Sequence, residues 1–119
     1  RATDDMVKKL EECFEAQESA FKAGEYNLSM QMDLEFHRTY IMGAKNNRLK
    51  DFLGTILEQA GRIAISRADD DNLQRNSIEQ HRKILSAVKE RDASLAEELV
   101  RKHAARVREY HLSRYYLLQ

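Results

Sequence analysis

Apolar side chains recur every three or four residues along most of the chain, which is the spacing of an amphipathic α-helix. The first of these stretches covers residues 3–23 and ends at Gly24, a residue type that often follows a helix C-terminus. The second covers residues 26–43 and carries apolar side chains on more than one face, as is typical of a helix in the centre of a bundle. The pattern therefore begins with two helices joined by a short turn.

Further helices follow in the second half of the pattern. One begins after Asn46 and Asn47, and another covers residues 72–90 after a loop. Asp92 is expected to cap a last helix that extends to about residue 117. Since no stretch alternates with the period of two that a half-buried strand would show, we predict an all-α fold. It is an antiparallel bundle of about five helices with short connections.

The composition agrees with this prediction and limits its size. A chain of 119 residues is long enough for one core and too short for two, so residues 1–119 form a single domain. The chain has no proline and only four glycines, so little interrupts the helices. A charged fraction of 34% is high, but it is compatible with helices that have well-solvated outer faces.

Charge and cysteine content exclude several classes of function. Lys plus Arg and Asp plus Glu both number 20, and a net charge of zero argues against a nucleic-acid-binding surface. The single cysteine, Cys13, excludes an internal disulfide and favours a reducing compartment. No apolar run has the length of a membrane span, and no secretory signal is evident.

Four polar residues on the inward faces are the candidates for chemistry. Asp33 and His37 are four residues apart, which places both side chains on one face of a helix, one turn apart. His81 and His103 lie in line with the inward positions of two later helices. One such histidine alone is more often a core residue bonded to a carbonyl than a metal ligand.

The argument changes when the four residues are counted together. Each would otherwise need its own partner in the core, whereas a single divalent cation satisfies all of them. Imidazoles with one carboxylate suit Zn, Ni, Co, Mn or Fe. The four ligands fit either a closed tetrahedral site or an octahedral site with positions left for water or a carboxylate.

Other candidates have weaker signals. Arg62 and Arg67 stand among mostly apolar neighbours and fit either a surface ion pair or a guanidinium that binds the carboxylate of a metabolite, with Arg62 the better candidate. His111 is expected to be solvated or partly packed, and Cys13 to lie in the core. Four basic side chains of the last predicted helix are expected to form a solvated face of that helix. They are Arg101, Lys102, Arg106 and Arg108.

Two ordered stretches resemble a known family. The stretch DLEFHRTYIMGAKNNRL is similar to the D-x-x-F-H … A-x-N-x-x-L signature of the FCD domain, the effector-binding and dimerisation domain of FadR-type GntR transcription regulators. The stretch EQHRKILSAVKERDASLAEELVRKH resembles the second half of that signature, which His103 closes. The opening RATDDMVKKL resembles the segment that follows the domain's first helix, so the similarity covers nearly the whole chain.

The resemblance implies a site and a partner. Asp33, His37, His81 and His103 match the four metal ligands of the family, whose metal-binding members hold Zn, Ni or a similar ion above a pocket for small carboxylates. Effector binding in such cytoplasmic regulators changes how a homodimer binds its operator DNA. The winged helix-turn-helix and the first helix of the domain are expected to be missing from this fragment. It should therefore not bind DNA specifically, and it should expose a groove where the first helix would pack.

The preferred hypothesis is an effector-sensing domain that binds a metal and a small carboxylate and is not an enzyme. A metal-dependent hydrolase is the alternative, but Glu35 and Glu79 each lie two residues from a ligand and point roughly away from it on a helix. A third possibility is a bundle that the metal only stabilises. In each case histidine ligation predicts metal affinity that falls as the pH drops through the histidine range.

Overall fold

The computed structural model describes residues 4–43 and 70–117, with side chains as far as residue 109. Four helices form these ranges: α1 (Asp4–Lys22), α2 (Tyr26–Met42), α4 (Asp71–Lys89) and α5 (Ala93–Leu117). No strand occurs among the described residues, which confirms the all-α bundle. The predicted third helix lies outside the described residues.

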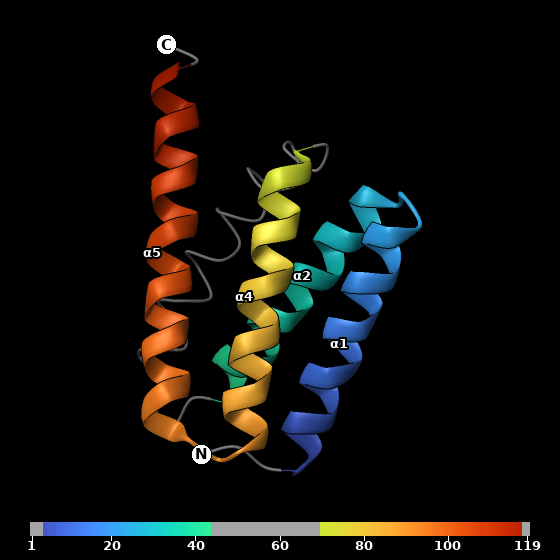
Figure 1. Cartoon of the computed structure of the whole chain (residues 1–119), viewed down its shortest axis with the longest axis vertical. Coiled ribbons are helices and arrows are strands. Elements are labelled where there is room, and N and C mark those ends of the chain that lie inside the picture. Colours follow the sequence, from blue (N-terminus) through green and yellow to red (C-terminus); the bar gives the residue numbers. More distant parts are fainter. Residues whose placement is uncertain (1–3, 44–69, 118–119) are drawn as a thin grey trace.

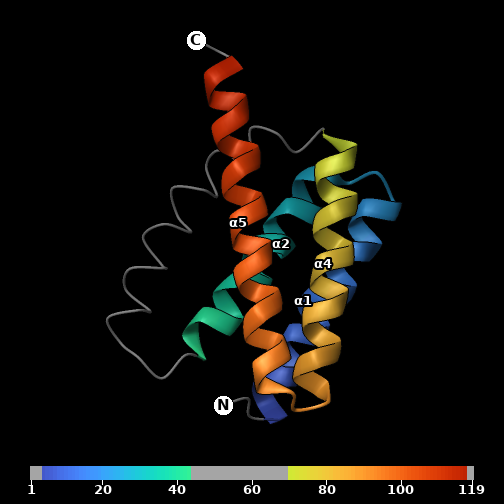
Figure 2. The ribbon, with the colours of Figure 1, turned by 60° about the vertical axis from the view of Figure 1, so that its left-hand side comes forward.

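The helices are arranged as two antiparallel pairs, α1 with α2 and α4 with α5 (Figure 1). Helix α1 packs against both α2 and α4, and α4 also contacts α2 and α5. The C-terminal end of α5 extends beyond the ends of the other three helices (Figure 2). Helix α4 thus has contacts with every other described helix, and its inward face is the natural place for a shared site.

Local sequence explains where the helices begin and end. Gly24 follows α1 with a φ of +77°, a backbone conformation that glycine adopts without steric cost. The Asp70 carboxylate accepts a hydrogen bond from the Leu73 amide at 3.0 Å and caps α4. The Asp92 carboxylate caps α5 through the Leu95 amide at 3.0 Å, as the sequence predicts.

The main core lies between α1, α2 and α4. Its centre consists of side chains with almost no exposed surface, and residues of α5 close one side. The buried members are Leu10, Cys13, Phe14, Phe36, Ile78, Ile84, Leu85 and Val88. Ala96, Leu99 and Val100 of α5 pack against them. This core leaves three histidines and one aspartate at its edge, where α2, α4 and α5 meet.

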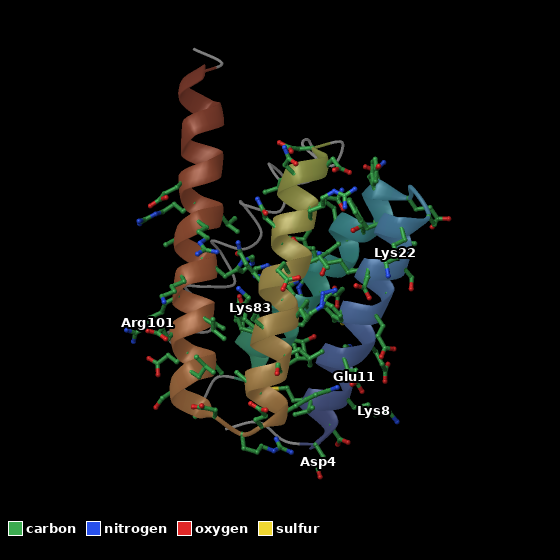
Figure 3. The ribbon with its side chains drawn as sticks, viewed as in Figure 1. Asp4, Lys8, Glu11, Lys22, Lys83 and Arg101 are labelled. Carbon is green, nitrogen blue, oxygen red and sulfur yellow. The ribbon has the colours of Figure 1, made fainter. Side chains whose placement is uncertain are left out.

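Charged side chains cover the outside of the bundle. Lys8 on α1 and Arg101 on α5 point away from it on opposite sides (Figure 3). Two ion pairs join α1 to α4, Glu18 with Arg82 and Glu11 with Lys89. A third joins Asp4 of α1 to Arg91 in the turn after α4. Within the described ranges, no helix is long and apolar enough to cross a membrane.

Candidate metal centre

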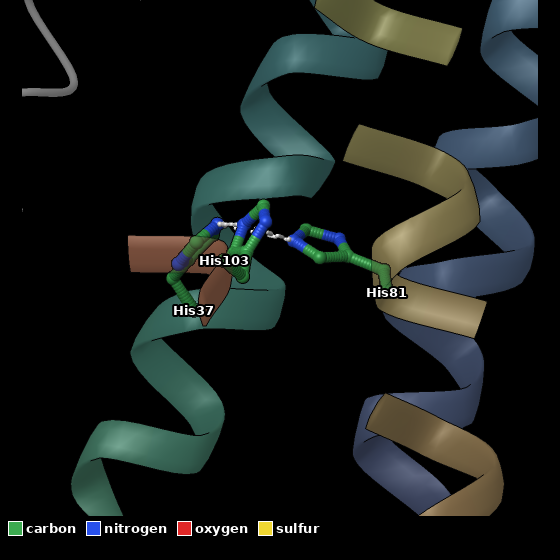
Figure 4. Close-up of side chains that lie close together, drawn as sticks. All are labelled: His37, His81 and His103. Atoms are coloured by element: carbon green, nitrogen blue, oxygen red, sulfur yellow. Dashed lines mark hydrogen bonds between the residues drawn. The ribbon is translucent and has the colours of Figure 1, made fainter. Parts of the chain in front are cut away.

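Three histidines from three helices converge on one point. His37 comes from α2, His81 from α4 and His103 from α5, and their imidazoles face one another (Figure 4). The three Nε2 atoms form a nearly equilateral triangle, since each pair is 3.1 Å apart. The inward register that the sequence predicts for these residues is therefore confirmed.

The centre lies at the edge of the core and is largely sealed from water. His81 has no exposed surface, His103 is 1% exposed, and His37 is partly buried. The Phe36 ring stacks on the His81 ring at a centroid distance of 4.1 Å and an interplanar angle of 11°. This stacking limits the rotation of the His81 ring and covers one of its faces.

The other ring nitrogen of each histidine has a hydrogen-bond partner. His81 Nδ1 lies 2.9 Å from the Gln17 Oε1 atom, and His103 Nδ1 contacts the Oε1 atom of Gln80. A carbonyl oxygen can only accept, so these two contacts favour a proton on Nδ1 of each histidine. Their Nε2 atoms then present lone pairs to the centre. The His37 Nδ1 atom contacts the Tyr40 hydroxyl at 2.9 Å, which can donate or accept.

This arrangement requires a proton or a cation between the facing nitrogens. Two unprotonated nitrogens with facing lone pairs repel each other at 3.1 Å unless a cation or a proton lies between them. In the metal-free protein, a proton on His37 Nε2 would meet this requirement. A divalent cation would meet it for all three nitrogens at once.

Asp33 lies next to this triangle. Its Oδ1 atom is 3.2 Å from the Nε2 atom of His81 and 3.6 Å from that of His37. The close-packed ligand group contains the three histidines without Asp33. The same oxygen accepts hydrogen bonds from Ser77 Oγ at 2.7 Å and from Gln17 Nε2 at 3.4 Å. Asp33 is therefore a charged neighbour of the triangle that faces two of its three members.

The environment keeps the donors in their metal-binding protonation states. Burial lowers the pKa of His81 well below its usual range and lowers the pKa of His103 to about 3. Burial opposes ionisation of Asp33, but the imidazoles of His81 and His37 and a hydrogen bond from Ser77 outweigh it and lower its pKa. The lowered pKa values of His81 and His103 favour neutral imidazoles, and the lowered pKa of Asp33 favours a carboxylate.

The spacing of the nitrogens fits a transition-metal ion. Nitrogens about 2.1 Å from one ion are separated by about 3.0 Å at octahedral angles and by about 3.4 Å at tetrahedral angles. The observed separation of 3.1 Å falls between these values. Neutral imidazoles with their Nδ1 protons donated to other groups are the usual form of metal-binding histidines. The residues present therefore fit a divalent ion of the Zn or Ni type.

An open hollow of about 370 Å³ adjoins the centre on the side of α4 and α5. His103 lines it together with Ser77, Gln80 and Arg106. Arg106, expected from the sequence to be only a solvated side chain, is exposed and lies close enough to His103 to help lower the pKa of that imidazole. Asp70 and Glu109 also line the hollow, so the charges around it are mixed.

Sequence reasoning missed the residues that surround the histidines. Gln17 occupies an inward position of α1, one turn after Cys13 and Phe14, and an amide on such an apolar face is a signal of a buried polar contact. Gln80 carries no comparable signal, because its contact depends on how α5 packs. Tyr40 lies one turn after Phe36 on α2, and its hydroxyl contacts His37 Nδ1.

The remaining candidates divide into two groups. Cys13 lies in the core as predicted, and burial raises the pKa of its thiol. Arg62 and Arg67 lie outside the described residues, and so does the side chain of His111. The structure therefore leaves the predicted contact of Arg62 with a ligand as a prediction.

Comparison with known proteins identifies the family. Searches of curated proteins and of solved structures each gave no match. The sequence model of the FCD domain matches residues 1–106. FCD domains are effector-binding domains of transcription regulators and occur in the GntR family. Because the match covers most of the 119 residues, the chain belongs to the FCD domain family.

Proposed function

We propose that this domain senses a small carboxylate metabolite through a bound divalent metal ion and does not act as an enzyme. His37, His81 and His103 would hold the ion, with Asp33 as the fourth protein ligand. The observation that carries the proposal is the convergence of three Nε2 atoms from three helices, each pair 3.1 Å apart. The ion would supply a Lewis-acidic centre at which a carboxylate can replace water.

The hollow beside His103 supports the proposed binding of a small carboxylate. It opens next to the centre, so a molecule in it can approach the ligand triangle from the side of α5. The Arg106 guanidinium lines the same hollow and can pair with a carboxylate group. A small organic acid would thus meet the metal at one end and a cationic side chain at the other. Arg62 remains a second candidate for this contact.

Regulation would follow from the position of the centre. The three histidines belong to α2, α4 and α5, so a ligand that alters their geometry alters how three helices pack. In the longer regulator, the domain would form a homodimer and transmit this change to an attached winged helix-turn-helix. Operator DNA would then be bound through that second domain, which fits a FadR-type GntR regulator.

The hydrolase alternative has less support from the described residues. Glu35 and Glu79 are the carboxylates nearest in sequence to the histidines, and each forms an ion pair on the outside of the bundle. Glu35 binds Arg38, and Glu79 binds Arg82. Neither is therefore placed to act as a general base at the centre. The geometry favours ligand binding over catalysis.

Metal content is the first test. The protein should be purified without a histidine tag or chelator and analysed by elemental mass spectrometry. We expect about one divalent ion per chain, lost in an Asp33→Ala/His37→Ala variant whose circular dichroism shows retained helices. Absence of metal from the wild type, even after incubation with Zn or Ni, would overturn the metal-dependent mechanism.

Thermal stability then separates the sensor from the stabilised bundle. Small carboxylates should be screened against metal-loaded and metal-free protein. A sensing domain predicts that at least one acid raises the melting temperature of the metal-loaded form only. If chelation lowers the melting temperature and no acid raises it, the metal has a structural role alone.

A further inference from the structure

We propose that Gln17 is a positioning residue of the metal centre, which holds His81 and Asp33 in their metal-binding orientations. The inference rests on the metal site proposed above and adds a residue that contacts no metal itself. Gln17 belongs to α1, whereas the histidines belong to the other three described helices. Its amide would therefore connect α1 to the centre.

The amide contacts two members of the centre at the same time. Its Oε1 atom accepts a hydrogen bond from His81 Nδ1 at 2.9 Å, and its Nε2 atom donates one to Asp33 Oδ1 at 3.4 Å. The negative carboxylate determines which end of the amide faces it, because only the NH₂ group can donate. The carbonyl oxygen is consequently directed at His81. One amide thus fixes both the tautomer of an imidazole and the position of a carboxylate.

Burial makes these contacts restrictive. Gln17 is 1% exposed and His81 is fully buried, so water cannot replace either hydrogen bond. The Phe36 ring covers one face of His81 and opposes a flip of the imidazole. With its proton held on Nδ1, His81 has to present the Nε2 lone pair to the triangle. Partners of this kind around metal-binding histidines commonly affect metal affinity.

A buried glutamine can also be a purely structural bridge between helices. Gln74 provides the matched comparison, because it is equally buried at 1% and donates from Nε2 to the Tyr26 carbonyl at 3.1 Å. This contact joins α4 to α2 and does not involve the histidines. Gln17→Met and Gln74→Met therefore remove the same chemical group at the same burial, and only the first change reaches the centre.

The first experiment needs no variant. Long-range ¹H–¹⁵N correlation spectra of the metal-free wild type report which ring nitrogen of each histidine carries the proton. We expect His81 to be protonated on Nδ1 alone, and we expect a mixture of the two tautomers in Gln17→Met but not in Gln74→Met. A wild-type His81 with its proton on Nε2 would overturn the proposal, whether or not the variants fold.

The second experiment measures the metal directly. Titration with Co²⁺, followed by its visible absorption, gives both the affinity and the coordination geometry. Gln17→Met should bind Co²⁺ roughly 10- to 100-fold more weakly than wild type and show an altered spectrum. Gln74→Met should lose stability to urea without either change.

The two proposals fail in different ways. If the wild type binds no metal, the metal site fails and the role of Gln17 fails with it. If the wild type and Gln17→Met bind Co²⁺ with equal affinity and identical spectra, the metal site stands and only the role of Gln17 is overturned. An equal loss of affinity in Gln17→Met and Gln74→Met would also overturn it, since a general loss of packing would then explain both.

Discussion

Ser77 donates a hydrogen bond from Oγ to the Oδ1 atom of Asp33 at 2.7 Å, and this contact joins α4 to α2 beside the three histidines. Both residues are 7% exposed. A carboxylate that is ionised away from water needs such donors, because burial of an uncompensated charge is expensive. Ser77 therefore stabilises the negative charge of the carboxylate beside the three histidines.

Replacement of Ser77 by alanine should destabilise the metal-free protein. The Asp33 carboxylate would lose its shortest hydrogen bond, which should cost about 1–3 kcal/mol of unfolding free energy. Urea denaturation in the presence of a chelator measures this cost. Ser86→Ala is the control, because Ser86 is an exposed residue of the same helix. Equal stability of the two variants would contradict the assigned role of Ser77.

The metal-free protein should lose stability as the pH falls below neutrality. In the unfolded chain His81 and His103 take up protons near pH 6.5, whereas burial lowers the folded pKa of His81 well below that range and that of His103 to about 3. Between these values the unfolded state binds more protons, so the free energy of unfolding falls by up to about 1.4 kcal/mol per pH unit for each histidine.

Asp33 extends the same trend to lower pH. Its pKa is lowered in the folded state, so its contribution is present above the ordinary carboxyl range and is lost as the pH falls through and below that range. Chemical denaturation at a series of pH values from 7 to 4, with chelator present, measures the effect of the histidines and the onset of the effect of Asp33. Unfolding free energies that stay constant between pH 7 and 5 would show that the two histidines are not buried as neutral groups.

Arg106 should affect binding of the organic acid but not of the metal. Arg106→Gln removes the guanidinium from the hollow beside His103 and should weaken acid binding roughly tenfold or more. Isothermal titration of metal-loaded protein with an acid found in the screen measures the change, and elemental analysis checks the metal. Arg108→Gln is the control, since Arg108 is an exposed arginine of the same helix and does not line the hollow. Equal affinities in both variants would exclude Arg106 as a contact.

Arg91 should tolerate glycine better than any β-branched residue. It has a φ of 59° in the turn between α4 and α5, a left-handed conformation that is costly for residues with a Cβ atom. Arg91→Gly removes that cost and gives up an exposed ion pair with Asp4, which contributes little. We expect a gain of up to about 1 kcal/mol in unfolding free energy.

Thermal or urea denaturation of Arg91→Gly and Arg91→Ile provides the comparison. The isoleucine variant should be less stable than the wild type, because a branched side chain is strained in this conformation. If both variants lose the same stability, the ion pair with Asp4 and not the backbone conformation determines the contribution of Arg91.

Periodicity alone was sufficient for the four described helices and for the inward positions of the histidines. The inward register of His37, His81 and His103 follows from their alignment with apolar neighbours on the same helix, because a helix places residues three and four apart on one face. The caps Asp92 and Gly24 were also predictable, since they depend on the backbone of the adjacent residues only. The two signature stretches also pointed to the FCD family, because each is a short run of residues that can be recognised in the sequence alone.

The surroundings of the histidines depend on the tertiary structure. Gln17 lies 64 positions before His81 in the chain, and its contact exists only because α1 packs against α4. Likewise, Gln80 reaches His103 only through the packing of α4 against α5. A repeating pattern shows which face of a helix is inward, but it does not show which atoms of two helices meet across an interface. The sequence therefore determined which histidines lie on inward faces, whereas helix packing decided which nitrogen of each histidine faces the centre.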